Sequence, residues 1–210
     1  MKIAGGGERG RALPVVVDLC GPTGDVTIFA FMRTTCSVFC GLSIDGYIAR
    51  PDGALDFLEG DGTAELGDHG YEAFVAGVDA IVMGRRSFEK VMSFDAWPYT
   101  RKVVVLSGGA PDLAAARARG ADVELLNATP NDVVGRLAAN GYHRLYIDGG
   151  LTVQRFLRAG LIDRLIVTRV PVLIGQGIPL FGALEGDIPL KLVASRSFPG
   201  GLVQCEYVRR

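Results

Sequence analysis

Two arginines follow a short apolar run and a glycine in the segment DAIVMGRRSFEKV, residues 79–91. The apolar run is typical of a buried strand, Gly84 permits a tight turn after it, and Ser87 is placed to cap a helix that begins there. N–H groups at the start of a helix attract anions, and Arg85 and Arg86 add two cations beside them. We therefore expect a site for a phosphate. The alternative is a capped helix with two arginines in solvent.

Two other segments place small residues after a strand. In RLYIDGGLTVQRFL, residues 144–157, a strand leads into Gly149-Gly150 and then into a helix, and in KVVVLSGG a strand ends at Ser107. The carboxyl ends of parallel strands meet at one edge of a sheet, where open α/β sheets bind ligands. Each loop alone is also compatible with a simple tight turn. Their convergence favours a binding edge.

From residue 36 onward, short β-rich runs alternate with helical patterns, which indicates crossover units and a largely parallel sheet. The predicted strands, apolar on nearly every residue, are 37–42, 80–83, 102–107, 122–125, 144–147 and 164–170. Runs 190–198 and 202–209, separated by Pro-Gly-Gly, predict an antiparallel hairpin at the C-terminus. The sequence therefore predicts an α/β fold with a mixed, mostly parallel sheet.

Three predicted helices have readable ends. Thr129 is a good N-cap with proline after it, and Gly141 is a stop signal. A second helix is expected from Pro111 to Gly120. A third should follow Gly150, with an inner apolar stripe that extends to Leu161.

Residues 1–35 are glycine-rich and show no sustained period, so we expect a poorly ordered appendage before a domain at 36–210. Gly5-Gly6-Gly7-Glu8-Arg9-Gly10 matches G-x-G-x-x-G, but too few residues precede it for the strand that this fingerprint requires. Met32 is a candidate for the natural start, which mass spectrometry of the native N-terminus would test.

Composition excludes several classes of partner. The net charge of −1 comes from mixed signs without a basic stripe, so we expect neither nucleic acid nor a membrane surface as a partner. No apolar run reaches the roughly 18 residues of a membrane helix. The four cysteines form no short-spaced metal pair and only two histidines are present, so no metal is implied. Free thiols fit a cytoplasmic protein.

Taken in order, these motifs resemble the dihydrofolate reductase-like family, and more closely its branch related to the C-terminal reductase domain of the bifunctional riboflavin-pathway deaminase/reductase. The resemblance covers about residues 36–208. It is carried by GLSIDGYIARPDGALDFL, VMGRRSFE, AWPY, KVVVLS, LYIDGG and LIDRLIVTRVPVLIGQGIPLF. The deaminase signatures H-x-E and P-C-x-x-C do not occur in this sequence, so we expect only reductase chemistry.

The resemblance implies a three-layer dihydrofolate reductase-like fold, with helices on both faces of the sheet, that binds NADPH. It assigns the adenosine-side phosphates to Gly84, Arg85, Arg86, Ser87 and Ser107. It assigns the pyrophosphate and nicotinamide side to Gly149, Gly150, Leu151 and Thr152, and places Ile48 and Ala49 near the nicotinamide.

The expected function is NADPH-dependent reduction of a small heterocyclic or conjugated substrate. Asp56 is the candidate proton donor, because Phe57 and Leu58 beside it could raise its pKa; an N-cap role is the alternative. Asp45, in an Asp-Gly pair, is better explained as a turn residue. Two other functions remain open: a non-catalytic nucleotide- or drug-binding module, and the 5-amino-6-(5-phosphoribosylamino)uracil reductase of riboflavin synthesis. The resemblance also implies a homodimer.

Overall fold

The computed structural model describes residues 33–59 and 67–210. The glycine motif at 5–10, Met32 and nearly all of the predicted appendage lie outside these residues. The predictions made for them stay predictions.

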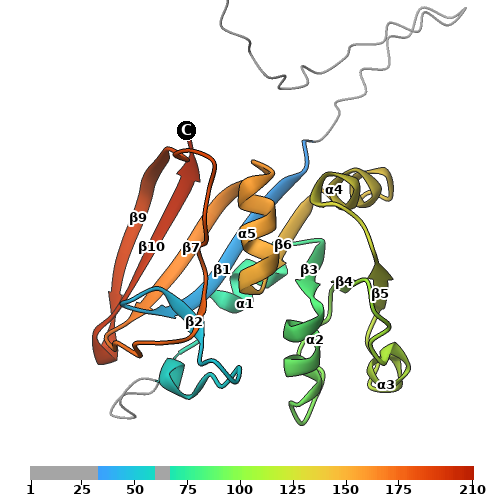
Figure 1. Ribbon diagram of the computed structural model, residues 1–210, viewed down its shortest axis with the longest axis horizontal. Helices are drawn as coiled ribbons and strands as arrows, with labels where there is room; N and C mark the ends of the chain where they lie inside the picture. The colour runs from blue at the N-terminus through green and yellow to red at the C-terminus, as the bar shows by residue number, and fades with distance from the viewer. Residues whose placement is uncertain (1–32, 60–66) are drawn as a thin grey trace, which may run out of the picture. The chain divides into compact units, whose positions relative to one another are not determined.

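An eight-stranded mixed sheet forms the centre of the domain (Figure 1). In spatial order its strands are β5 (Val123–Leu126), β4 (Lys102–Leu106), β3 (Ala80–Gly84), β6 (Arg144–Asp148), β1 (Thr35–Ser43), β7 (Ile162–Val170), β10 (Leu202–Arg209) and β9 (Leu190–Phe198). The first six are parallel, and β10 runs antiparallel to both β7 and β9. All six predicted parallel strands and the C-terminal hairpin are confirmed.

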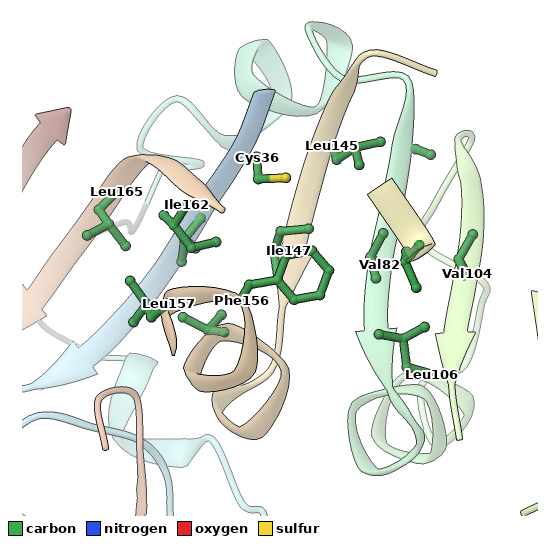
Figure 2. Packing of buried hydrophobic residues seen from close by; sticks show 14 of the residues in the cluster. Cys36, Val82, Val104, Leu106, Leu145, Ile147, Phe156, Leu157, Ile162 and Leu165 are labelled. Atoms are coloured by element: carbon green, nitrogen blue, oxygen red, sulfur yellow. The ribbon is translucent and has the colours of Figure 1, made fainter. Parts of the chain in front are cut away.

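Helices cover both faces of the sheet, because side chains of successive strand residues point to opposite faces. Leu145 and Ile147 pack in a core with α4 (Pro130–Ala139) and α5 (Gly150–Arg158). Tyr146, between them, packs in a second core with α1 (Tyr71–Ala76), α2 (Arg85–Met92) and α3 (Leu113–Ala118). Figure 2 shows the first core, where Phe156 of α5 lies over β6. The three-layer fold is confirmed.

The helix ends match their capping signals in part. Oγ1 of Thr129 accepts a hydrogen bond from the N–H of Asp132 at 3.3 Å, and Gly141 follows α4 with a φ of +83°, as predicted. Two boundaries were wrong. Asp112 rather than Pro111 precedes the first turn of α3 and caps it. Leu161 lies beyond α5, which ends at Arg158, although its side chain still packs against the core.

A second, small sheet was not predicted. It pairs β2 (Tyr47–Ala49) with β8 (Ile178–Pro179), which are too short to show a period in the sequence. Two 3-10 turns, Asp56–Glu59 and Pro199–Gly201, complete the elements of the described residues.

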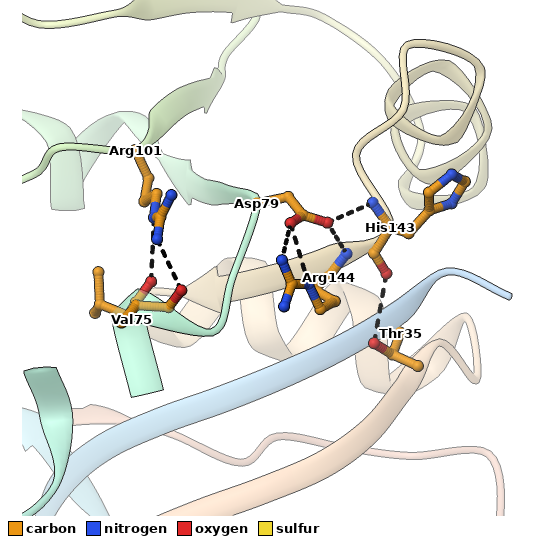
Figure 3. Close-up of polar contacts among 7 residues, drawn as sticks. Thr35, Val75, Asp79, Arg101, His143 and Arg144 are labelled. Atoms are coloured by element: carbon orange, nitrogen blue, oxygen red, sulfur yellow. Dashed lines mark hydrogen bonds and ion pairs between the residues drawn. The ribbon is translucent and has the colours of Figure 1, made fainter. Parts of the chain in front are cut away.

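Asp79 ties together the amino-terminal edge of the sheet (Figure 3). Its carboxylate accepts hydrogen bonds from the backbone N–H groups of His143 and Arg144, at 2.9 and 2.8 Å, and from the Arg144 guanidinium at 2.6 and 3.1 Å. Partial burial opposes ionisation, but the guanidinium and the amides lower the pKa of Asp79 below its usual value. Charge-assisted hydrogen bonds of Asp79 therefore join β3 to β6 at this edge.

We expect Asp79→Asn to lower the free energy of unfolding by about 1.5 to 3 kcal/mol at neutral pH, the range for hydrogen bonds to a charged group. A carboxyl group whose pKa is lower in the folded state stabilises the folded protein at pH values above its unfolded pKa of about 3.9. This stabilisation is lost as the pH falls through the folded pKa. Urea unfolding of both proteins should show the difference shrinking in acid. The exposed Asp187→Asn serves as control, and a difference independent of pH would contradict the assignment.

Candidate active site

Three loops leave the carboxyl edge of the sheet side by side. Strand β3 pairs with β4 on one side and with β6 on the other, so the loops that follow Gly84, Leu106 and Asp148 are neighbours (Figure 1). The sequence prediction that these segments share an edge is confirmed by this register.

The β3–α2 and β6–α5 loops are pressed against each other. A Cβ atom at Gly149 would lie 2.2 Å from Oγ of Ser87, and one at Gly84 would lie 2.9 Å from Oγ1 of Thr152. Gly149 also has a φ of +83°, a conformation that other residues rarely adopt. The sequence predicted that Ser87 caps α2, and this prediction is wrong. The helix begins at Arg85 with Gly84 as its N-cap, and Ser87 instead faces the neighbouring loop.

The small β2–β8 sheet covers the start of α5. A Cβ atom at Gly150 would lie 2.7 Å from the carbonyl oxygen of Pro179 and 3.3 Å from Cδ1 of Ile48. Nε2 of Gln154 donates to the same carbonyl oxygen at 2.9 Å. Ala49, next to Ile48, is buried. These contacts bring Ile48 beside the paired glycines, more than 100 positions away in the sequence.

Arg85 and Ser107 both lie against Gly109 at the other side of the site. A Cβ atom at Gly109 would lie 3.6 Å from Oγ of Ser107 and 3.7 Å from Nη1 of Arg85. The Arg85 side chain is about half exposed and lies 3.6 Å from the Glu89 carboxylate one turn further along α2. Arg86 and Leu151 are exposed in the first turns of their helices.

The contacts thus bring together most of the residues assigned to the cofactor: Ile48, Gly84, Arg85, Ser87, Ser107, Gly149, Gly150 and Thr152. Ala49, Arg86 and Leu151 are sequence neighbours of these residues.

The starts of α2 and α5 fit a phosphate group. In the described part of the chain, α3 and α4 have their first N–H groups capped by Asp112 and Thr129, whereas the N-cap glycines of α2 and α5 provide no side-chain cap. Neither α2 nor α5 has an acidic residue in its first turn. Free N–H groups and the positive end of the helix dipole favour an anion. Two such ends, beside two arginines, fit a dinucleotide with several phosphates.

We expect Gly149→Ala to destabilise the protein more than Gly120→Ala does. Both glycines have a φ of +83°, but a Cβ at Gly120 meets nothing within 4 Å, whereas at Gly149 it meets Ser87. Gly120→Ala should therefore cost only the backbone strain, about 1 to 2 kcal/mol, and Gly149→Ala should exceed it. Denaturant unfolding measures both. Equal losses would show that the two loops can separate freely.

The geometry does not favour Asp56 as a proton donor. Both of its carboxylate oxygens accept from the Arg50 guanidinium at 2.7 Å, and the Asp56 side chain is 58% exposed. The bond to Arg50 lowers the pKa of Asp56. A carboxylate in this setting is ionised near neutral pH, and an ionised carboxylate has no proton to give.

Asp148 suits proton donation better than Asp56, although the sequence analysis did not single it out. It is partly buried at the end of β6, and burial raises its pKa against the opposing hydrogen bonds from the Gly149 amide and Tyr146. The hydroxyl of Tyr146 lies 3.4 Å from Oδ1 of Asp148 and 2.9 Å from the Phe39 carbonyl oxygen. The signal was present in LYIDGG, where Asp148 directly precedes the first glycine, but only the glycines were interpreted.

Aromatic side chains surround this acid on the α1 face. The Tyr71 ring makes edge contacts with Phe39 and Tyr146, at centroid distances of 5.5 and 6.3 Å. Burial, with the Asp148 charge, raises the pKa of Tyr71 to about 12 and also raises the pKa of Tyr99. These phenols are therefore neutral. Neutral phenols and aromatic rings therefore lie beside Asp148 on this face.

The described residues bring together no cluster of three or more His, Cys, Asp or Glu side chains suited to a metal ion. Cys36, Cys40 and Cys205 are not joined to one another in disulfides. Within residues 33–59 and 67–210, no helix has the length and apolar character needed to cross a membrane.

Comparison with known proteins gives consistent results. The family model described as the RibD C-terminal domain matches residues 35–204. The uncharacterized protein YwjB of Bacillus subtilis is 33% identical over 180 residues, covering 85% of this chain and 99% of YwjB.

Two solved structures show the same fold. A putative riboflavin biosynthesis protein from Shewanella sp. PV-4 is 37% identical, with a TM-score of 0.77 over 84% of this chain and 99% of that one. The Thermotoga maritima diaminohydroxyphosphoribosylaminopyrimidine deaminase/5-amino-6-(5-phosphoribosylamino)uracil reductase matches over 85% of this chain and 57% of its own, at 15% identity and a TM-score of 0.63, which supports the fold. The resemblance found in the sequence is confirmed, and the chain belongs to the RibD C-terminal domain family.

Proposed function

We propose that this protein is an NADPH-dependent reductase of a small, planar heterocyclic or conjugated substrate. The observation that carries the proposal is the pair of uncapped helix starts, α2 and α5, beside Arg85 and Arg86 and next to the acid Asp148. Phosphate binding and proton donation are thus available at adjacent loops of one sheet edge.

Arg85, Arg86, Ser87 and Ser107 would hold the adenosine-side phosphates, and the start of α5 would hold the pyrophosphate. Ile48 and Ala49 would lie on the nicotinamide side. Bound NADPH supplies the hydride. The protein's part is to orient both reactants and to manage the proton.

Asp148 holds a proton on its carboxyl group and gives it to the substrate atom that gains electron density after hydride transfer. An acid with a raised pKa keeps its proton closer to neutral pH. The phenols of Tyr71 and Tyr146 stay neutral, so neither adds a negative charge beside Asp148.

The riboflavin-pathway reductase is a specific candidate within this proposal. It is supported by family membership and by the 37% identical protein described as a putative riboflavin biosynthesis protein. Rescue of a bacterial strain that lacks the pathway's reductase activity would test it. A strain that still requires riboflavin would leave another heterocycle as the substrate.

The general proposal is tested by oxidation of NADPH with a panel of pyrimidines, pterins and quinones, followed by nicotinamide absorbance. Turnover with any member would exclude the binding-module alternative. Tight NADPH binding without turnover across the panel would favour a module that holds a ligand.

We also propose a cytoplasmic homodimer. The cysteines of the described residues form no disulfide with one another, which suits a reducing compartment. Leu192 and Val193 on the edge strand β9 are each 52% exposed, and Val203 on β10 is 39% exposed. An exposed apolar edge strand favours pairing with another chain. Light scattering should give twice the 22.3 kDa chain mass, and a single-chain mass would refute the dimer.

A further inference from the structure

Residues 44–49 and 171–180 form one unit over the start of α5. The Ile44 N–H donates to the Val172 carbonyl oxygen at 2.9 Å, and the Leu180 N–H donates to the Gly46 carbonyl oxygen at 3.1 Å. Strand β2, which directly follows Gly46, pairs with β8. The conformation of the 171–180 loop therefore determines where this unit meets Gly150.

The side chain of Asp45 holds the far turn of that loop. Its Oδ1 accepts from the Ile174 N–H at 3.3 Å and its Oδ2 accepts from the Gly175 N–H at 2.8 Å. The Ser43 hydroxyl, together with these amides, lowers the pKa of Asp45. Both oxygens of the Asp45 carboxylate thus bind a turn that lies about 130 residues further along the sequence.

The same loop supplies the wall beside the paired glycines. After the turn, Gly177 packs so closely on β2 that a Cβ there would lie 2.4 Å from the Ala49 carbonyl oxygen. Two residues later, the Pro179 carbonyl oxygen lies over Gly150 and beside Ile48. A shift of the turn at Gly175 would be transmitted to this wall, because the loop has few residues between the two points.

We infer that Asp45 is a positioning residue for the cofactor: by holding the turn at Ile174 and Gly175, it fixes Ile48 and Pro179 as a preformed wall at the nicotinamide side. The inference rests on the proposed function. Asp45 is exposed and acts only through the loop. A preformed wall binds more tightly than one that must be ordered on binding.

The test compares Asp45→Asn with Asp52→Asn in the full chain. Asp52 is a matched control, since its exposed carboxylate accepts a single backbone bond from Ala54 at 2.9 Å in the next turn. Nicotinamide fluorescence should show NADPH affinity weakened about tenfold by Asp45→Asn, the order of one charge-assisted hydrogen bond. Asp52→Asn should stay within about twofold. Saturating turnover should be unchanged, so that the loss falls on KM and not on kcat.

Amide hydrogen exchange gives the second readout. Without NADPH, exchange at Ile174 and Gly175 should be faster in Asp45→Asn than in the wild-type protein, and saturating NADPH should slow it again. Wild-type affinity in the variant, with or without faster exchange, would overturn the inference. Absence of NADPH binding by the wild-type protein would refute the proposed function itself, and the inference with it. A cooperative thermal transition confirms that the variant is folded.

Discussion

Arg85→Ala is expected to weaken NADPH binding by about 10- to 100-fold while changing NADH binding little. NADH lacks the 2′-phosphate, and a charge-assisted hydrogen bond to that phosphate contributes about 1.5 to 3 kcal/mol. Arg86→Ala should act in the same direction. Arg85 lies beside Ser107 at the uncapped start of α2, where the negative group would meet free N–H donors as well. Fluorescence titration with both nucleotides measures the ratio.

Arg158→Ala is the matched control, because Arg158 is an exposed arginine at the opposite end of α5. It should leave both affinities within about twofold. An equal loss of NADPH and NADH affinity in Arg85→Ala would place this arginine on the pyrophosphate. Unchanged affinities for both nucleotides would show that Arg85 does not contact the cofactor.

Asp148→Asn is expected to lower kcat by about 10²- to 10⁴-fold, the usual contribution of a general acid, with NADPH affinity preserved. The amide has the same shape but no transferable proton. The wild-type rate should fall as the pH rises through the raised pKa of Asp148, because only the protonated form donates. The variant's residual rate should lack that step. Steady-state kinetics across pH measures both effects.

Tyr146→Phe and Asp56→Asn are the comparison variants for Asp148→Asn. Removing the Tyr146 hydroxyl takes away a neighbour 3.4 Å from Oδ1 and should alter the rate less than Asp148→Asn does. Asp56→Asn should leave kcat nearly unchanged, since Asp56 is tied to Arg50. Full activity in Asp148→Asn, or a large loss in Asp56→Asn, would restore Asp56 as the acid.

The sheet was predictable because its central strands are buried on both faces. Ile81, Val82 and Met83 are fully buried, as are Val103 and Val104, so each run is apolar without alternation. The α4 cap was predictable for a different reason. Thr129 and Asp132 are three positions apart, and capping depends on local contacts only.

The rest depends on contacts between distant segments. The three residues of β2 carry no sequence signal for pairing with Ile178. Ser87 has the sequence position of a helix cap, and only the structure shows that it faces Gly149 instead. The sequence shows that Asp148 precedes Gly149, but the burial that raises its pKa comes from neighbouring elements. Asp45 was correctly interpreted as a turn residue, but its bonds reach Gly175.

The central claim is that the uncapped starts of α2 and α5 bind a phosphorylated dinucleotide. Titration of the wild-type protein with NADPH and with NADH, followed by nicotinamide fluorescence, tests it most directly. The structure predicts saturable binding of NADPH that is tighter than that of NADH. Absence of binding by either nucleotide would contradict the claim and show that this family member uses the same sheet edge for another ligand.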